Sequence, residues 1–464
     1  MVDAGDSKSP AARRAGSIPA SGTSDGEPDG EPDANVDADA SARSATLAAT
    51  CGQAISYLLA VVFARTLGVE GFEAYAFASA AFIVMVTFTP RGFDKFALRV
   101  LPPRGDGALL LGYLRFSRRR TLWTALAVGA GVAAWALATD RIGGEARIAL
   151  LLSCVALPFG AAVHLKLEAL TAFGAAVPAT LVFRVLVPAV ALAAFGLCLA
   201  AGAPVGGPTA IACWAVAWAV ALAAMTRLLR GRLPDCASQA LPAVERPGEW
   251  ERGARPFWIY RLSMAALGQA GVLMLDLLRA PPGTVGAYAA ALASASLVQV
   301  LATSTNRIYA GRLSLLLERQ DLGQITQLRR QRLRWLALPV ALYGLAMLLG
   351  ARPLLALFRP EFVDEGATAL RILAVAMAMA VLLGMGSTLL KFRRRNRAIY
   401  TGVAVAACVQ LLLLALLVPR LGATGAAIAC GISLCGMYAH FAREGQGEMR
   451  ALRAEAAAAA SASE

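Results

Sequence analysis

The feature that most constrains this chain is a series of twelve apolar stretches between Ala45 and Phe441. A transmembrane helix needs about 20 mainly apolar residues at about 1.5 Å per residue. The stretches reach or approach that length, and they lack the alternating pattern of barrel strands. We therefore predict an all-α polytopic membrane protein with helices at 45–67, 72–90, 121–139, 146–165, 176–200, 208–228, 256–278, 284–306, 335–351, 366–389, 399–418 and 423–442.

Basic residues in the loops alternate from one side of these helices to the other. Twenty-seven lysines and arginines fall in the loops of one side, chiefly 91–120, 227–255, 307–334 and 391–397, and eight fall in the opposite loops. Because cytoplasmic loops carry the excess of Lys and Arg, the first set is predicted to be cytoplasmic. An even number of helices then leaves both termini in the cytoplasm.

The first 43 residues differ in composition from the rest of the chain. They contain nine acids and four bases, are rich in Asp, Gly, Pro and Ser, and have no aromatic residue. Such a segment cannot bury enough apolar surface to fold, so we predict a disordered acidic cytoplasmic tail. The remainder is predicted to form an N-terminal six-helix bundle at 44–228, a cytoplasmic linker at 229–255, a C-terminal six-helix bundle at 256–443 and a cytoplasmic tail at 444–464.

Short internal repeats support this division into two halves. GFEAYAFASA at 71–80 resembles TVGAYAAALA at 284–293, and GGPTAIAC at 206–213 resembles GATGAAIAC at 422–430. The matching tyrosines, Tyr75 and Tyr288, and the matching cysteines, Cys213 and Cys430, are separated by nearly the same number of residues. Six helices per half give both halves the same orientation, as in transporters whose cavity lies between two bundles.

Among the arginines inside predicted helices, Arg184 and Arg261 are the candidates for a functional charge at membrane depth. Arg184 lies about eight residues into the helix at 176–200, and Arg261 about five residues into the helix at 256–278, with no acid at helical spacing from either. An arginine at membrane depth costs at least about 2.5–3.5 kcal/mol. Each of them either lines a cationic cavity for an anionic head group, since a planar guanidinium binds two phosphate oxygens at once, or extends to the interface.

Uncharged polar residues inside the predicted helices are candidates to line such a cavity: Gln53, Gln269, Gln299 and Asn306. They could hydrogen-bond sugar hydroxyls, or equally bond neighbouring helices. Asp276 is the candidate coupling acid, and a structural ion pair is the alternative interpretation of this residue.

Nothing in the sequence indicates catalysis or a bound cofactor. There is no phosphate-binding loop, so we do not expect nucleotide hydrolysis. The two histidines, His164 and His440, cannot form a metal cluster, and the eight cysteines lack metal-ligand spacing. We predict no catalytic residue, no metal site and no cofactor, and no nucleic-acid partner.

Several motifs resemble those of Wzx-type polysaccharide flippases, which belong to the multidrug, oligosaccharidyl-lipid and polysaccharide exporter superfamily. They are ARTLGVEGFEAYAFASA at 64–80, RGFDKFALRVLP at 91–102, VGAYAAA at 285–291, LFRPEFVDEGATALRIL at 357–373 and PRLGATGAAIACGIS at 419–433. The resemblance covers about 45–440. It implies a bacterial inner-membrane protein that moves undecaprenyl-diphosphate-linked sugars to the periplasmic face, with Arg184 and Arg261 binding the diphosphate. The long acidic amino terminus departs from the family pattern.

The expected function is therefore a lipid-linked oligosaccharide flippase or exporter that works by alternating access in polysaccharide biosynthesis (lipopolysaccharide or exopolysaccharide). Its expected partners are the lipid-linked glycan, membrane lipids and, as candidates, a polysaccharide polymerase and glycosyltransferases. Two alternatives remain: a cation-coupled multidrug antiporter on the same scaffold, and a non-transporting membrane scaffold for polysaccharide assembly.

Overall fold

The computed structural model describes residues 32–101, 107–233, 243–318, 321–393 and 395–462, and within these ranges it is helical, with no strand. The chain divides into two compact units, Met1–Ala40 and Ser41–Glu464. In the first unit the described residues, 32–40, are helical. Everything below concerns the second unit.

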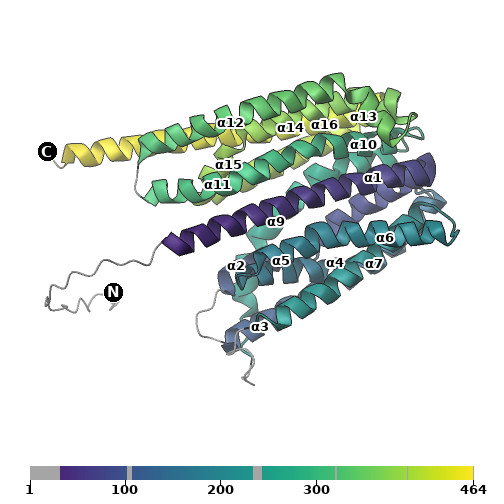
Figure 1. Ribbon diagram of the computed structural model, residues 1–464, viewed down its shortest axis with the longest axis horizontal. Helices are drawn as coiled ribbons and strands as arrows, with labels where there is room; N and C mark the ends of the chain where they lie inside the picture. Colours follow the sequence, from purple (N-terminus) through teal and green to yellow (C-terminus); the bar gives the residue numbers. More distant parts are fainter. Residues whose placement is uncertain (1–31, 102–106, 234–242, 319–320, 394, 463–464) are drawn as a thin grey trace, which may run out of the picture. The chain divides into compact units, whose positions relative to one another are not determined.

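In the part of the chain that the structure describes, the first bundle contains seven α-helices and one π-helical turn; Figure 1 shows their arrangement. Its long first helix is broken at Gly68, where φ is 76°, a conformation that glycine adopts without steric cost. The elements are α1 (Pro32–Phe88), α2 (Phe93–Val100), α3 (Gly107–Ala138), α4 (Gly144–Ala172), α5 (Ala176–Leu181), η1 (Val182–Leu186), α6 (Val187–Ala200) and α7 (Gly207–Arg230).

The second bundle is drawn in teal-green to yellow in Figure 1. Its last helix is broken at Gly422, where φ is 51°. The elements are α9 (Pro247–Leu277), α10 (Thr284–Ala295), η2 (Ser296–Val298), α11 (Gln299–Glu318), α12 (Leu322–Leu349), α13 (Ala351–Phe358), α14 (Phe362–Leu383), α15 (Met385–Phe392) and α16 (Asn396–Ala462).

The helices agree with the predicted membrane segments. Among the described residues nine helices are long and apolar enough to cross a membrane, and two of these contain a glycine break, at Gly68 and Gly422, that divides each into two segments. The remaining predicted segment, 256–278, lies almost entirely within α9, whose ends carry charges. The chain is a multi-pass membrane protein built of two helical bundles.

The helices extend further than predicted at three places. Helix α1 begins at Pro32, within the segment predicted to be a disordered tail, whose first 31 residues lie outside the described residues. Helix α9 begins at Pro247, within the predicted linker, and α16 continues to Ala462, through the predicted carboxyl-terminal tail. Apolar length marks the membrane part of a helix but not the polar turns that continue it.

The two ends of the bundles differ in composition. We call the end formed by residues 91–101, 246–261, 391–393 and 395–397 the arginine-rich end, and the end formed by the glycine breaks the Gly68 end. At the Gly68 end the bundles are joined by Arg65, whose Nε and Nη2 donate to the carbonyls of Leu357 (2.7 Å) and Ala356 (2.9 Å). The rings of Phe72 and Phe362 pack at 5.7 Å beside this contact. The Gly68 end is therefore closed between the bundles.

Candidate functional site

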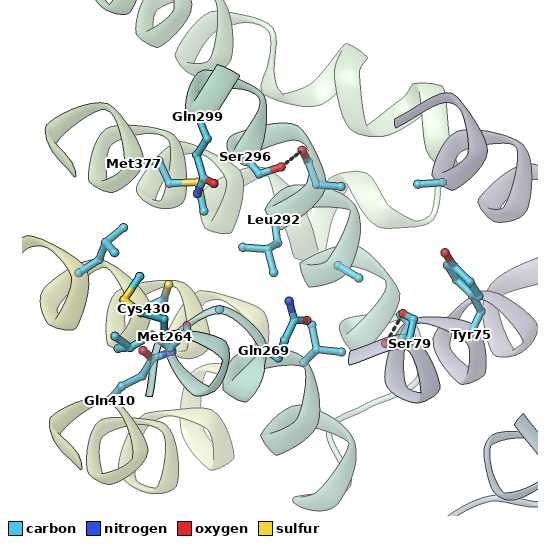
Figure 2. A pocket seen from close by; sticks show the side chains of 18 of the residues that line it. Tyr75, Ser79, Met264, Gln269, Leu292, Ser296, Gln299, Met377, Gln410 and Cys430 are labelled. Carbon is cyan, nitrogen blue, oxygen red and sulfur yellow. Dashed lines mark hydrogen bonds between the residues drawn. The ribbon is translucent and has the colours of Figure 1, made fainter. Parts of the chain in front are cut away.

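A cavity of about 450 Å³ lies between the two bundles. Figure 2 shows Tyr75 and Ser79 on one side of it, from α1, and Gln269 and Met377 on the others, from α9 and α14. Most of its wall is apolar, and its volume lies in the range of small-molecule and head-group pockets.

The polar groups that face this cavity are neutral. They include the side chains of Gln269, Gln299 and Gln410, and no described lining residue is charged. Gln410 is 1% exposed; its Nε2 donates to the Leu267 carbonyl at 3.0 Å, while its Oε1 has no hydrogen-bond partner among the described residues. A buried amide oxygen without a donor is costly, so a ligand hydroxyl or amide at this position would be stabilised.

Only some of the residues predicted to line a cavity do so. Gln269 and Gln299 line the cavity, whereas Gln53 does not. The side chain of Asn306 lies outside the described part of the structure. Gln410, on α16, was missed because a single glutamine in an apolar helix does not indicate which way its side chain points.

The short helix α2 forms one wall of the arginine-rich end. The chain turns into it through Arg91 and Gly92, whose φ angles are 49° and 81°. Gly92 packs so closely on α9 that an added Cβ would lie 2.3 Å from the Ala254 carbonyl oxygen. Nearby, the Trp258 indole N–H donates to the Phe88 carbonyl at 3.0 Å. These contacts hold α2 against the first turns of α9.

Arg261 of α9 forms an ion pair with Asp94 of α2. The Asp94 side chain is 1% exposed and that of Arg261 is 20% exposed. The expectation that Arg261 lacks a neutralising acid is therefore wrong, because the acid comes from a helix distant in sequence. Arg261 does not line the cavity, but it lies about one and two turns from the lining residues Met264 and Gly268, on the same face of α9. It thus lies on the arginine-rich side of the cavity, which we call the mouth.

Further cations gather near this mouth from both bundles. Lys95 of α2 pairs with Glu168 of α4. Arg99 of α2 lies over the Phe257 ring of α9 at 4.9 Å, and Lys391 of α15 lies 5.4 Å from the Tyr260 ring centre. We call Lys95, Arg99, Arg261 and Lys391 the mouth cluster.

The charges of this cluster are only partly compensated. Within the described residues Asp94 and Glu168 are the two acids paired with its four cations. Desolvation, and then the positive charge of Lys95, lowers the pKa of Lys391, so cations from opposite bundles repel each other here. An anion between the bundles would relieve that repulsion.

Arg184 lies in a local distortion of its helix. Pro188 has no N–H to donate to the Arg184 carbonyl, and the chain forms the π-helical turn η1 at this point. An added Cβ on Gly52 of α1 would lie 2.3 Å from the Arg184 carbonyl oxygen, so α1 packs directly on the turn. The side chain is exposed, with its guanidinium 5.6 Å from the Phe183 ring centre, and it does not line the central cavity.

Glu73 and Asp276 are carboxylates on the Gly68 side of the cavity. Glu73 of α1 accepts hydrogen bonds from the backbone N–H groups of Val285 (2.9 Å) and Gly286 (3.1 Å), at the start of α10 in the other bundle. A carboxylate at a helix amino terminus is favourable because it satisfies N–H groups that have no partner within the helix. Asp276 lies one turn of α9 beyond the lining residue Val272, and no ion pair with it occurs in the described ranges.

The residues that sequence reasoning missed were present in a quoted motif. Asp94, Lys95 and Arg99 all lie in RGFDKFALRVLP. Their approximate i, i+4 spacing on a short helix was the available signal, but their partners, Arg261, Glu168 and Phe257, are far away in the sequence. Within the described residues no group of three or more His, Cys, Asp or Glu side chains could hold a metal ion.

No known family model and no curated protein matches this sequence. Solved structures do match. An inward-facing multidrug resistance MATE family transporter of the MOP superfamily has 14% identity and a TM-score of 0.68, with 88% of this chain and 98% of that chain covered. The lipid II flippase MurJ, in an inward closed conformation, has 10% identity and a TM-score of 0.60, with 86% of each chain covered.

A third similar structure is a MOP superfamily transporter from Pyrococcus furiosus, with 12% identity and a TM-score of 0.56. The match covers 89% of this chain and 96% of that one, and the binding pocket of that transporter has reverse polarity. Proteins of one fold thus differ in the charge of their pockets. The present chain has the two-bundle helical fold of MOP-superfamily transporters.

Proposed function

We propose that this protein transports a lipid-linked oligosaccharide whose head group carries a diphosphate, moving that head group across the bacterial inner membrane by alternating access. The observation that carries the proposal is the position of an uncharged cavity, whose mostly apolar wall includes three glutamine amides, next to a mouth with an excess of positive charge. The amides suit sugar hydroxyls and the mouth suits phosphate. This combination fits a glycan on a diphosphate better than it fits a cationic drug.

The proposed direction follows from the charge of the two ends. The arginine-rich end is assigned to the cytoplasm because of the excess of basic loops there. The fold resembles the inward-facing MATE structure (TM-score 0.68) more closely than the outward-facing one (0.54). With the Gly68 end closed by Arg65 and Glu73, the bundles are then poised to receive a head group from the cytoplasmic leaflet.

The roles proposed for individual residues differ with their surroundings. Arg261, held by Asp94, would orient one phosphate, and Lys391 and Arg99 would neutralise the other. Arg184 remains a candidate contact for a phosphate at the interface, since its side chain is exposed. Gln269, Gln299 and Gln410 would bind the first sugars. Cations at the mouth, rather than in mid-membrane, avoid the full cost of burying a charge.

The test is glycan export in cells that lack their own flippase and depend on this protein. Neutralising the mouth with Lys391→Gln together with Arg99→Gln should reduce export at least about tenfold, since each lost cation contributes about 1 kcal/mol at the membrane surface. Arg420→Gln, at an exposed arginine of the Gly68 end, is the matched control and should export normally. Equal export by all three proteins, at equal amounts in the membrane, would refute the proposal.

A second candidate is a cation-coupled multidrug antiporter, and one observation favours it. Asp276 of α9 lies near Glu73 of α1, one turn beyond the cavity, so two carboxylates from opposite bundles stand close together. Such a pair could take up a cation during the transport cycle. Proton-dependent drug efflux that is lost in Asp276→Asn would support this function. A lack of such efflux by the unmodified protein would exclude it.

A further inference from the structure

The wall of the first bundle holds a second cavity, of about 510 Å³, between α3, α4 and α7. It shares no lining residue with the central cavity. Each of the three helices contributes one face, as shown by the spacing of Leu111, Arg115, Arg118 and Leu122 on α3. The side chains of Ala162 and Ala169 on α4 are small, and the side chains of α3 and α7 do not fill the space beside them.

Along the membrane normal, the cations of this cavity lie toward the arginine-rich end, and apolar side chains line the part closer to the middle of the membrane. Arg115, Arg118 and Lys166 line it, whereas Leu122, Pro158 and Phe159 form its apolar part. No lining residue that the structure describes is acidic. The charges of Arg118 and Arg230 act on Lys166, so like charges gather here, and none of them forms an ion pair within the described ranges.

The level of the cations matches the edge of the bilayer. The hydrocarbon core is about 30 Å thick, which corresponds to about 20 residues of helix. Counted from the Gly68 end of each helix, that distance ends near Arg118 on α3, near Lys166 on α4 and between Arg227 and Arg230 on α7. Three helices independently place their cations where phosphates of the lipid head groups lie.

We propose that this cavity binds a resident anionic phospholipid of the cytoplasmic leaflet, with its phosphate against Arg115, Arg118 and Lys166 and an acyl chain along the apolar part. The transported substrate is a poorer occupant, because the cavity lies within one bundle and substrate must pass between two. The phosphate neutralises a cluster that otherwise repels itself, and the chain fills a space that side chains leave open. The inference is independent of the proposed transport function.

The test is binding of short-chain phosphatidylglycerol to the purified full chain in detergent, followed by native mass spectrometry. Arg115→Gln with Arg118→Gln should weaken binding of the first lipid about 30-fold, from the loss of two cations. The matched control is Arg119→Gln with Arg120→Gln on the same turn; those arginines pair with Glu245 and Glu251, and their loss should change binding less than about twofold.

Two further arms identify the ligand. Phosphatidylcholine of the same chain length should bind the unmodified protein much more weakly, and inorganic phosphate should not displace phosphatidylglycerol. Equal effects of the two arginine pairs, equal binding of the two lipids, or displacement by phosphate alone would each overturn the proposal. If the double variant aggregates, Arg118→Gln alone should still weaken binding about fivefold, and unchanged binding would refute the site.

Discussion

The ion pair between Asp94 and Arg261 leads to a prediction with a definite magnitude. In Arg261→Gln the Asp94 carboxylate stays in a place where its side chain is 1% exposed, without its partner. Breaking a buried pair in this way costs about 3–5 kcal/mol of the free energy of unfolding. Asp94→Asn should cost less, because the remaining guanidinium is 20% exposed and can reach water.

The assay is unfolding in mixed micelles with increasing sodium dodecyl sulfate, followed by tryptophan fluorescence, for both single variants and the double variant. We expect the double variant to be more stable than Arg261→Gln, with a coupling energy of about 2 kcal/mol between the two sites. Transport by the folded double variant then measures what the guanidinium contributes to substrate binding. Additive single effects, or an Arg261→Gln variant as stable as the unmodified protein, would refute the reasoning.

Three other substitutions test separate parts of the structure. Glu73→Gln weakens the charge-assisted bonds to α10 by about 1–2 kcal/mol. The population with an open Gly68 end, measured from distances between spin labels across that end, should therefore rise about tenfold. Gly52→Val should destabilise the protein by about 1–3 kcal/mol or more in the same unfolding assay, because the new Cβ meets the Arg184 carbonyl at 2.3 Å. At Gly268, which lines the cavity, an added Cβ meets nothing within 4 Å, so Gly268→Leu should place its side chain in the cavity and abolish transport while the melting temperature is kept.

Each of these has a matched control on the same kind of element. Glu70→Gln changes an exposed acid on α1 and should leave the spin-label distances unchanged. Gly131→Val and Gly344→Leu add side chains where an added Cβ meets nothing within 4 Å, and they should affect neither unfolding nor transport. A control that behaves like its test variant would contradict the local explanation.

The membrane segments and the two bundles could be predicted from sequence because both depend on local properties. Apolar length sets each segment, and the glycines at 68 and 422 mark breaks at positions where a side chain would be strained. The helix extension at 32–44 was missed because polar turns carry no apolar signal. The Ala-rich end at 451–464 was expected to be a frayed or weakly helical tail, and α16 continues into it as far as Ala462.

The candidate site was less predictable because its contacts are distant in sequence. Arg261 was identified as unusual, but its partner Asp94 lies on a helix of the other half, and no local spacing connects them. Asp276 was identified as a lone acid, whereas its neighbour Glu73 was not, because Glu73 lies near the start of its predicted helix, at 72–90, and its backbone partners are in the other half of the chain. Buried polar pairs are determined by packing between helices rather than by the pattern within one helix.

The central claim is that the bundles carry a diphosphate-bearing head group across the membrane, and translocation in proteoliposomes tests it most directly. The purified protein is reconstituted with a polyprenyl-diphosphate-linked oligosaccharide, and the glycans that reach the far leaflet are counted with a membrane-impermeant glycosidase. We expect translocation of this lipid, and much slower translocation of the same glycan on a neutral polyprenyl lipid. Equal rates for both lipids, or no translocation of either by a folded, correctly inserted protein, would contradict the claim.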